Sequence, residues 1–220
     1  MIYGSGMSGS ISSTPAERRQ ALNSIYRYVA YLFFIALICQ CMYWDALPRD
    51  IGNQFTESSF AEISQTAMLL VSLIFLWKIR AMGVYRHGVV LMFAFLLASL
   101  IREQDFMLDR VFDDLWQWLV ALVLVPALVF LVRYRLRVLD ECCRYMQQMS
   151  FGLFLGGFVT VYVFSRLMGR GIFWEAILKA QYIYEIKSTV EEGIETLGYA
   201  LMLLAIVELW FWARRQVGAA

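Results

Sequence analysis

Six apolar runs, each bounded by charged or polar residues, restrict this chain to very few folds. The last run continues from Tyr199 to Trp212 and is followed by Arg214 and Arg215. About 20 apolar residues are what a helix needs to cross a bilayer. With 60% hydrophobic and only 17% charged residues, the chain is too apolar for an ordinary soluble domain. The sequence therefore predicts an all-α, polytopic membrane protein.

The apolar runs predict six transmembrane helices. We expect residues 1–20 to be a flexible cytoplasmic tail, 21–215 a membrane domain, and 216–220 a short cytoplasmic tail. Between the last two spans, residues 169–187 mix aromatic and aliphatic side chains with charges, which favours an outer amphipathic helix in the membrane interface. The predicted spans are about 25–44, 61–77, 88–101, 115–131, 151–168 and 191–213.

Small residues in the fifth predicted span indicate a close contact with another helix. Gly152, Gly156 and Gly157 lie there within two turns. In lipid, glycines allow two helix backbones to approach each other.

The distribution of charge predicts the orientation. If the chain crosses the membrane at these six spans, twelve Lys and Arg residues lie on the same side as the two termini and seven lie on the other side. Cytoplasmic loops are enriched in Lys and Arg, so both termini are expected in the cytoplasm. Fourteen of the 18 acidic residues fall on the opposite, outer side. The outer face is therefore expected to be acidic.

Carboxylates from three predicted spans are expected at the same level of the membrane. They open the second span, follow the third, and open the sixth. Oxygen ligands of this kind suit a hard cation such as Ca²⁺ or Mg²⁺, or a positively charged group. The candidate ligands are Glu62, Glu103, Glu192 and Glu195, with Gln65, Arg102, Asp105, Glu191 and Tyr199 in support.

A structural interpretation of the same residues stays open. Ser188 and Glu191, Thr189 and Glu192, and Ser59 and Glu62 each match a capping box, in which the acidic residue serves a helix N-terminus. Asp113 or Asp114 is likewise expected to cap the fourth span. Neither Glu195 nor Glu103 is explained by capping. The structural alternative for these two is a buried ion pair with Arg102.

Motifs of several enzyme classes are missing. His87 is the only histidine and falls on the predicted inner side, so a His-rich zinc site has too few ligands. Glu191-Glu192 resembles the paired glutamates of CAAX-type intramembrane proteases, but Thr196 stands where their arginine is expected. Their paired histidine motifs, and the three histidines of ceramidase-like hydrolases, cannot form here. No phosphate loop, dinucleotide fingerprint or serine nucleophile motif appears.

Three functional hypotheses follow. The first is a bacterial inner-membrane protein that binds a cation or positively charged group at the outer acidic cluster, as a small transporter, channel or sensor. The second is an accessory or scaffolding subunit that docks a protein partner in the membrane or at its outer face. The third is a divalent-metal-dependent enzyme acting on lipid headgroups. Membrane lipids are expected partners and nucleic acid is not; whether the chain is an enzyme stays open.

Overall fold

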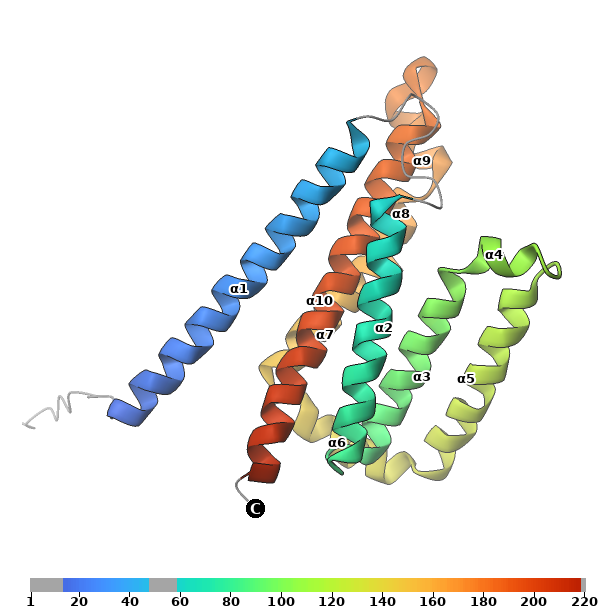
Figure 1. Ribbon diagram of the computed structural model, residues 1–220. Coiled ribbons are helices and arrows are strands. Elements are labelled where there is room, and N and C mark those ends of the chain that lie inside the picture. The colour runs from blue at the N-terminus through green and yellow to red at the C-terminus, as the bar shows by residue number, and fades with distance from the viewer. Residues whose placement is uncertain (1–13, 48–58, 219–220) are drawn as a thin grey trace, which may run out of the picture. The chain divides into compact units, whose positions relative to one another are not determined.

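The computed structural model describes residues 14–47 and 59–218 (Figure 1). The chain forms two compact units, residues 1–39 and 40–220, and each is described by itself. Helix α1 (Pro15–Ala46) makes up the described part of the first unit and continues into the second.

A capping box begins α1. The Thr14 amide donates to Glu17 Oε2 at 2.7 Å, and the Glu17 amide donates to Thr14 Oγ1 at 3.3 Å. Pro15 occupies the first helical position, where its missing N–H costs nothing. The prediction of a flexible tail through residue 20 is therefore wrong from Pro15 onward, while residues 1–13 lie outside the described part.

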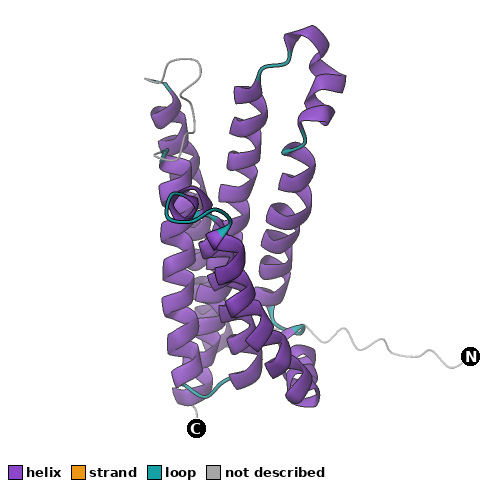
Figure 2. Ribbon diagram, turned by 90° about the vertical axis from the view of Figure 1, so that its right-hand side faces the viewer, coloured by secondary structure: helices purple, strands orange, loops and turns teal. Residues whose placement is uncertain are grey.

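The described part of the second unit consists of helices joined by short turns and loops, without strands (Figures 1 and 2). Helix α4 connects α3 to α5 at one end (Figure 1). The α7 rod passes through a five-residue π-helix before it ends. The helices are α2 (Phe60–Ala81), α3 (Arg86–Arg102), α4 (Asp105–Asp109), α5 (Leu115–Arg133), α6 (Arg135–Tyr145), α7 (Met149–Val159), the π-helix η1 (Thr160–Phe164), α8 (Ser165–Met168), α9 (Gly171–Leu178), the 3₁₀ turn η2 (Lys179–Gln181) and α10 (Tyr184–Gly218).

Five helical rods are long and apolar enough to cross a membrane. They are α1, α2, α5, the continuous α7–η1–α8 rod and α10. Helix α3 lies where a further span is predicted, but its 17 residues are fewer than the roughly 20 that a bilayer requires. All six apolar runs thus form helices, and the crossing of the membrane by all six stays a prediction.

Two polar segments differ from their predictions. The expected interfacial helix over 169–187 is divided into α9, η2 and the first turn of α10. The α10 helix also continues to Gly218, so most of the expected tail at 216–220 is helical. Between the predicted spans 115–131 and 151–168, the segment after Arg133 forms the amphipathic helix α6. Its Val138 is buried, whereas Leu136 and Leu139 are exposed.

Helix α10 forms the core of the second unit. It packs against α7 and α2, while α2 packs against α3 and α3 against α5. Its buried side chains are mostly apolar, including Met202, Ile206 and Leu209, but Glu195 and Glu208 are buried too. Helix α5 buries none of its residues within the chain. An apolar surface this large favours lipid around it.

A glycine contact joins α7 to α10. A Cβ atom added at Gly157 would lie 2.6 Å from the Gly198 carbonyl oxygen and 2.7 Å from Met202 Cγ. Gly152 and Gly156 have open space instead. The predicted close helix contact is therefore confirmed at Gly157 alone of the three.

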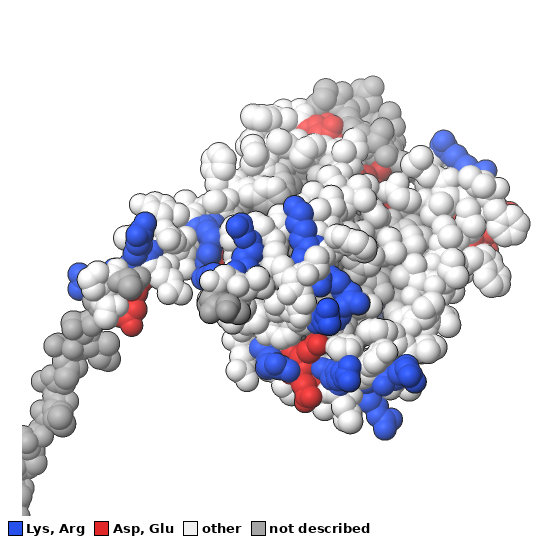
Figure 3. All heavy atoms as spheres, turned by 60° about the horizontal axis from the view of Figure 1, so that its bottom comes forward, with Lys and Arg blue, Asp and Glu red and all other residues white. Residues whose placement is uncertain are grey.

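Charges separate between the two ends of the second unit. One end carries the basic last turns of α2, α5, α6 and α10, and Lys and Arg side chains gather on this end in Figure 3. The other end carries Glu62 in the first turn of α2, Glu103 after α3 and the acidic residues that open α10. The two ends match the predicted basic and acidic sides.

Candidate functional site

A cavity of about 620 Å³ opens at the acidic end of the second unit. All four candidate ligands line it, so α2, α3 and α10 bring together the carboxylates that the sequence placed at one level. The lining residues are Glu62, Ile63, Thr66, Arg102, Glu103, Gln104, Asp105, Phe106, Met107, Trp116, Arg166, Glu192 and Glu195.

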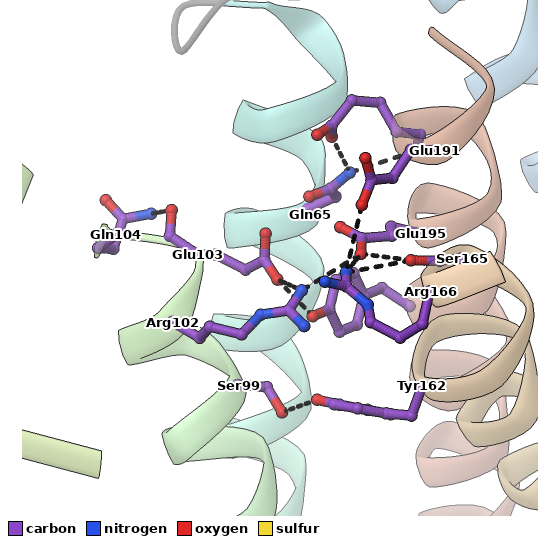
Figure 4. Close-up of polar contacts among 12 residues, drawn as sticks. Gln65, Ser99, Arg102, Glu103, Gln104, Tyr162, Ser165, Arg166, Glu191 and Glu195 are labelled. Carbon is purple, nitrogen blue, oxygen red and sulfur yellow. Dashed lines mark hydrogen bonds and ion pairs between the residues drawn. The ribbon is translucent and has the colours of Figure 1, made fainter. Parts of the chain in front are cut away.

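Arg102 connects two of these carboxylates (Figure 4). Its Nη2 atom donates to Glu103 Oε1 at 2.5 Å and lies 3.4 Å from Glu195 Oε1 on α10. Tyr199 is buried one turn below Glu195, and its hydroxyl donates to Glu103 Oε1 at 2.6 Å. Burial raises the pKa of Glu103 above its ordinary value, although the Arg102 guanidinium lowers it. The alternative of an arginine–carboxylate pair is thereby confirmed.

Glu195 has a second arginine partner that the sequence analysis missed. Its carboxylate accepts hydrogen bonds from Arg166 and, at 2.6 Å, from Ser165 Oγ (Figure 4). Both residues belong to α8, directly after the π-helix. Glu195 is only 3% exposed, so its charge is buried between two guanidinium groups. An arginine inside an apolar span is the sequence signal that could have pointed to this pair.

Glu191 is part of the same charge network and does not cap a helix. Because α10 begins at Tyr184, Ser188 and Thr189 lie inside the helix and cannot form the predicted capping boxes. Glu191 instead pairs with Lys187, one turn earlier, at 2.7 Å and lies 3.7 Å from Arg166 Nη2. The capping interpretation is therefore wrong for Glu191 and Glu192.

Glu192 has a different environment from the other acids. Its Oε2 atom accepts a hydrogen bond from Gln65 Nε2 at 2.8 Å, and the same amide donates to Thr196 Oγ1 at 3.0 Å. Gln65 is fully buried, and its Oε1 atom has no hydrogen-bond partner among residues 14–47 and 59–218. No ion pair to Glu192 occurs within those residues. Glu192 thus lines the cavity, and the hydrogen bond that its carboxylate accepts comes from the Gln65 side-chain amide.

The remaining acidic residues have local roles. Ser59 is the N-cap of α2 and its hydroxyl accepts from the Glu62 amide at 3.3 Å, which confirms the cap at that helix. Asp105 is exposed and accepts from the Phe106 amide. Asp114 occupies the N-cap position of α5 but makes no side-chain cap bond there, so the predicted cap is wrong for this residue.

The carboxylates of the cavity are not grouped as metal ligands in the described part of the chain. Within the described ranges, no group of three or more His, Cys, Asp or Glu side chains is arranged to hold a metal. Glu103 and Glu195 direct oxygens at arginines instead. The Ca²⁺ or Mg²⁺ site stays a prediction.

Comparisons with known proteins add nothing to the geometry. No family model, curated protein or solved structure matches this chain.

Proposed function

We propose that this protein is a membrane protein that binds a cation or positively charged group in the acidic cavity, as a small transporter, channel or sensor. The observation that carries the proposal is the charge balance of the lining. Five acidic side chains line the cavity against two arginines. Even with both guanidinium groups paired, the cavity retains an excess of negative charge, which attracts a cation.

Glu192 is the residue that we expect to bind the ligand. Glu103 and Glu195 are engaged by Arg102 and Arg166, so their charge is already neutralised. Glu192 lines the same cavity with a hydrogen bond from Gln65 as its side-chain support. The Gln65 side chain that supports Glu192 is itself fully buried, and its Oε1 atom lacks a donor in the described part. An ammonium group or a metal cation at Glu192 would supply the counter-charge that this carboxylate lacks.

The position of the cavity fits a role at a membrane surface. It lies at the acidic end of helices that are long enough to span a bilayer, and the basic residues gather at the other end. We place the acidic end outside and both termini in the cytoplasm of a bacterial inner membrane, because Lys and Arg favour the cytoplasmic side. With α3 as a short span, the chain crosses the membrane six times.

Calorimetric titration of the full chain in lipid nanodiscs tests the proposal. The probes are Mg²⁺, Ca²⁺ and ethylammonium, each titrated into the wild type, Glu192→Gln and Glu175→Gln. Glu175 is an exposed acid on α9 that does not line the cavity. We expect one of the probes to bind the wild type and Glu175→Gln equally, and Glu192→Gln about tenfold or more weakly, since a charge-assisted contact is lost.

Two results would contradict the proposal: no binding of any probe to the wild type, or equal binding to wild type and Glu192→Gln. If binding is found, flux of the bound cation into proteoliposomes separates a transporter or channel from a sensor. The accessory-subunit and lipid-enzyme hypotheses remain predictions that no contact described above favours.

A further inference from the structure

A second hollow, of about 640 Å³, lies at the basic end of the second unit, where α5 ends and α6 begins. Residues 132–137 line it, and three of them are the exposed arginines Arg133, Arg135 and Arg137. In the part of the chain that the structure describes, none of the three forms an ion pair with a carboxylate. Three unneutralised guanidinium groups therefore surround one hollow, which we call the α5–α6 arginine site.

An anchored aromatic ring organises this site. The Tyr134 ring centroid lies 5.9 Å from Cζ of Arg133 and 6.0 Å from Cζ of Arg137. The ring itself packs on Phe130 of α5 at 4.8 Å and on His87 of α3 at 5.1 Å between centroids. Because two other helices hold Tyr134, the two guanidinium groups are presented from a fixed platform.

Apolar side chains lie next to the arginines. On α6, Leu136 and Leu139 are three positions apart and share one face, with exposed fractions of 70% and 59%. Val138, on another face, is buried against the protein. The helix thus offers a protein-facing side and an exposed apolar side, with Arg135 and Arg137 next to Leu136 in the chain, which is the pattern of a helix at a membrane interface.

We propose that the α5–α6 arginine site binds the phosphate group of an anionic phospholipid, with the acyl chains against Leu136 and Leu139. Guanidinium groups bind phosphate oxygens through paired, charge-assisted hydrogen bonds. The exposed leucines beside the arginines favour a lipid over free phosphate, because they give an acyl chain an apolar surface. This inference does not depend on the function proposed for the acidic cavity.

Lipid binding to the full chain in a neutral detergent tests the inference. Native mass spectrometry measures the retention of phosphatidylglycerol and of phosphatidylcholine by the wild type, by Arg133→Gln/Arg137→Gln, and by Arg214→Gln/Arg215→Gln. The last variant removes the same charge from the same end of the second unit, outside the hollow. We expect the wild type to retain phosphatidylglycerol in preference to phosphatidylcholine. Arg133→Gln/Arg137→Gln should bind phosphatidylglycerol about tenfold or more weakly, and Arg214→Gln/Arg215→Gln should bind it like the wild type.

Should the glutamine variant fail to fold, Arg133→Lys/Arg137→Lys is measured in its place. It keeps the charge and loses the paired geometry, so we expect it to bind phosphatidylglycerol more weakly than the wild type does. Equal retention of both lipids, or an equal loss in both double variants, would overturn the inference. Complete displacement of the lipid by millimolar inorganic phosphate would also overturn it, because the site would then recognise phosphate without a lipid.

Discussion

Arg102 and Glu195 are 93 residues apart in the chain, yet Arg102 Nη2 lies 3.4 Å from Glu195 Oε1. Through this contact α3, which packs on α2 and α5, is linked to the charged end of α10. The same glutamate accepts from Arg166, so one carboxylate connects three separate helices.

Replacement of Glu195 by glutamine is expected to destabilise the protein. The substitution leaves the charges of Arg102 and Arg166 without their shared partner, and loss of one member of a buried pair costs about 3 kcal/mol. We expect the melting temperature in detergent, followed by circular dichroism, to fall by about 5–10 °C. Glu175→Gln, on exposed α9, is the control and should melt like the wild type. An unchanged melting temperature for Glu195→Gln would show that the network contributes no stability.

Two adjacent glycines should respond oppositely to alanine. At Gly157 a methyl group meets the Gly198 carbonyl at 2.6 Å and the Met202 backbone nitrogen at 2.9 Å, so α7 and α10 must separate. We expect Gly157→Ala to cost about 1–3 kcal/mol. Gly156→Ala meets open space and should gain up to about 1 kcal/mol from helix propensity. Thermal melting of both variants in one detergent measures the difference, and equal melting temperatures would contradict it.

Glu141 is expected to hold α6 against α3. Its Oε2 atom accepts from the Gly88 amide at 2.7 Å and the His87 amide at 2.9 Å, at the N-terminus of α3. Glu141→Ala leaves both amides without this acceptor and should cost about 1–2 kcal/mol. Limited proteolysis between α5 and α7 should then become faster. Asp140→Ala, the exposed neighbour, serves as the control; if it has the same effect, the loss is not due to the cap.

The alkylation rate of Cys142 should rise at a higher pH than the rate of an ordinary cysteine does. Partial desolvation raises the pKa of this exposed thiol above its ordinary value of 9.0, and the nearby Cys143 and Glu141 raise it further. Because the thiolate is the reactive form, its fraction is small at neutral pH and rises only as pH passes the raised pKa. In a variant with serine at the other three cysteines, the Cys143 contribution is lost, but the desolvation and Glu141 remain, so the iodoacetamide rate should still have a midpoint above 9.0. A midpoint at or below that of free cysteine would contradict the prediction.

The sequence predicted the helices well because apolar length is a direct physical requirement of a bilayer. It also placed Glu62, Glu103 and Glu192 at one level, since each follows or precedes an apolar run. It failed for Glu191, because nothing between Tyr184 and Ser188 breaks a helix and α10 starts one turn earlier than the polar residues suggested. The partners of Glu195 were missed for another reason. Which face of a helix an arginine occupies depends on the helical phase, and that phase changes within the chain at η1.

The π-helix Thr160–Phe164 acts as an angular spacer within a single rod. A π turn holds one residue more than an α turn, and each residue of an α-helix turns the chain by about 100°. Conversion of this turn to regular α-helix at unchanged length would keep Gly157 on Gly198, but would rotate Ser165 and Arg166 by about 100° away from Glu195. The rod therefore has a packing half at Gly157 and a charged half at Ser165 and Arg166, and the helix type at η1 sets the angle between them.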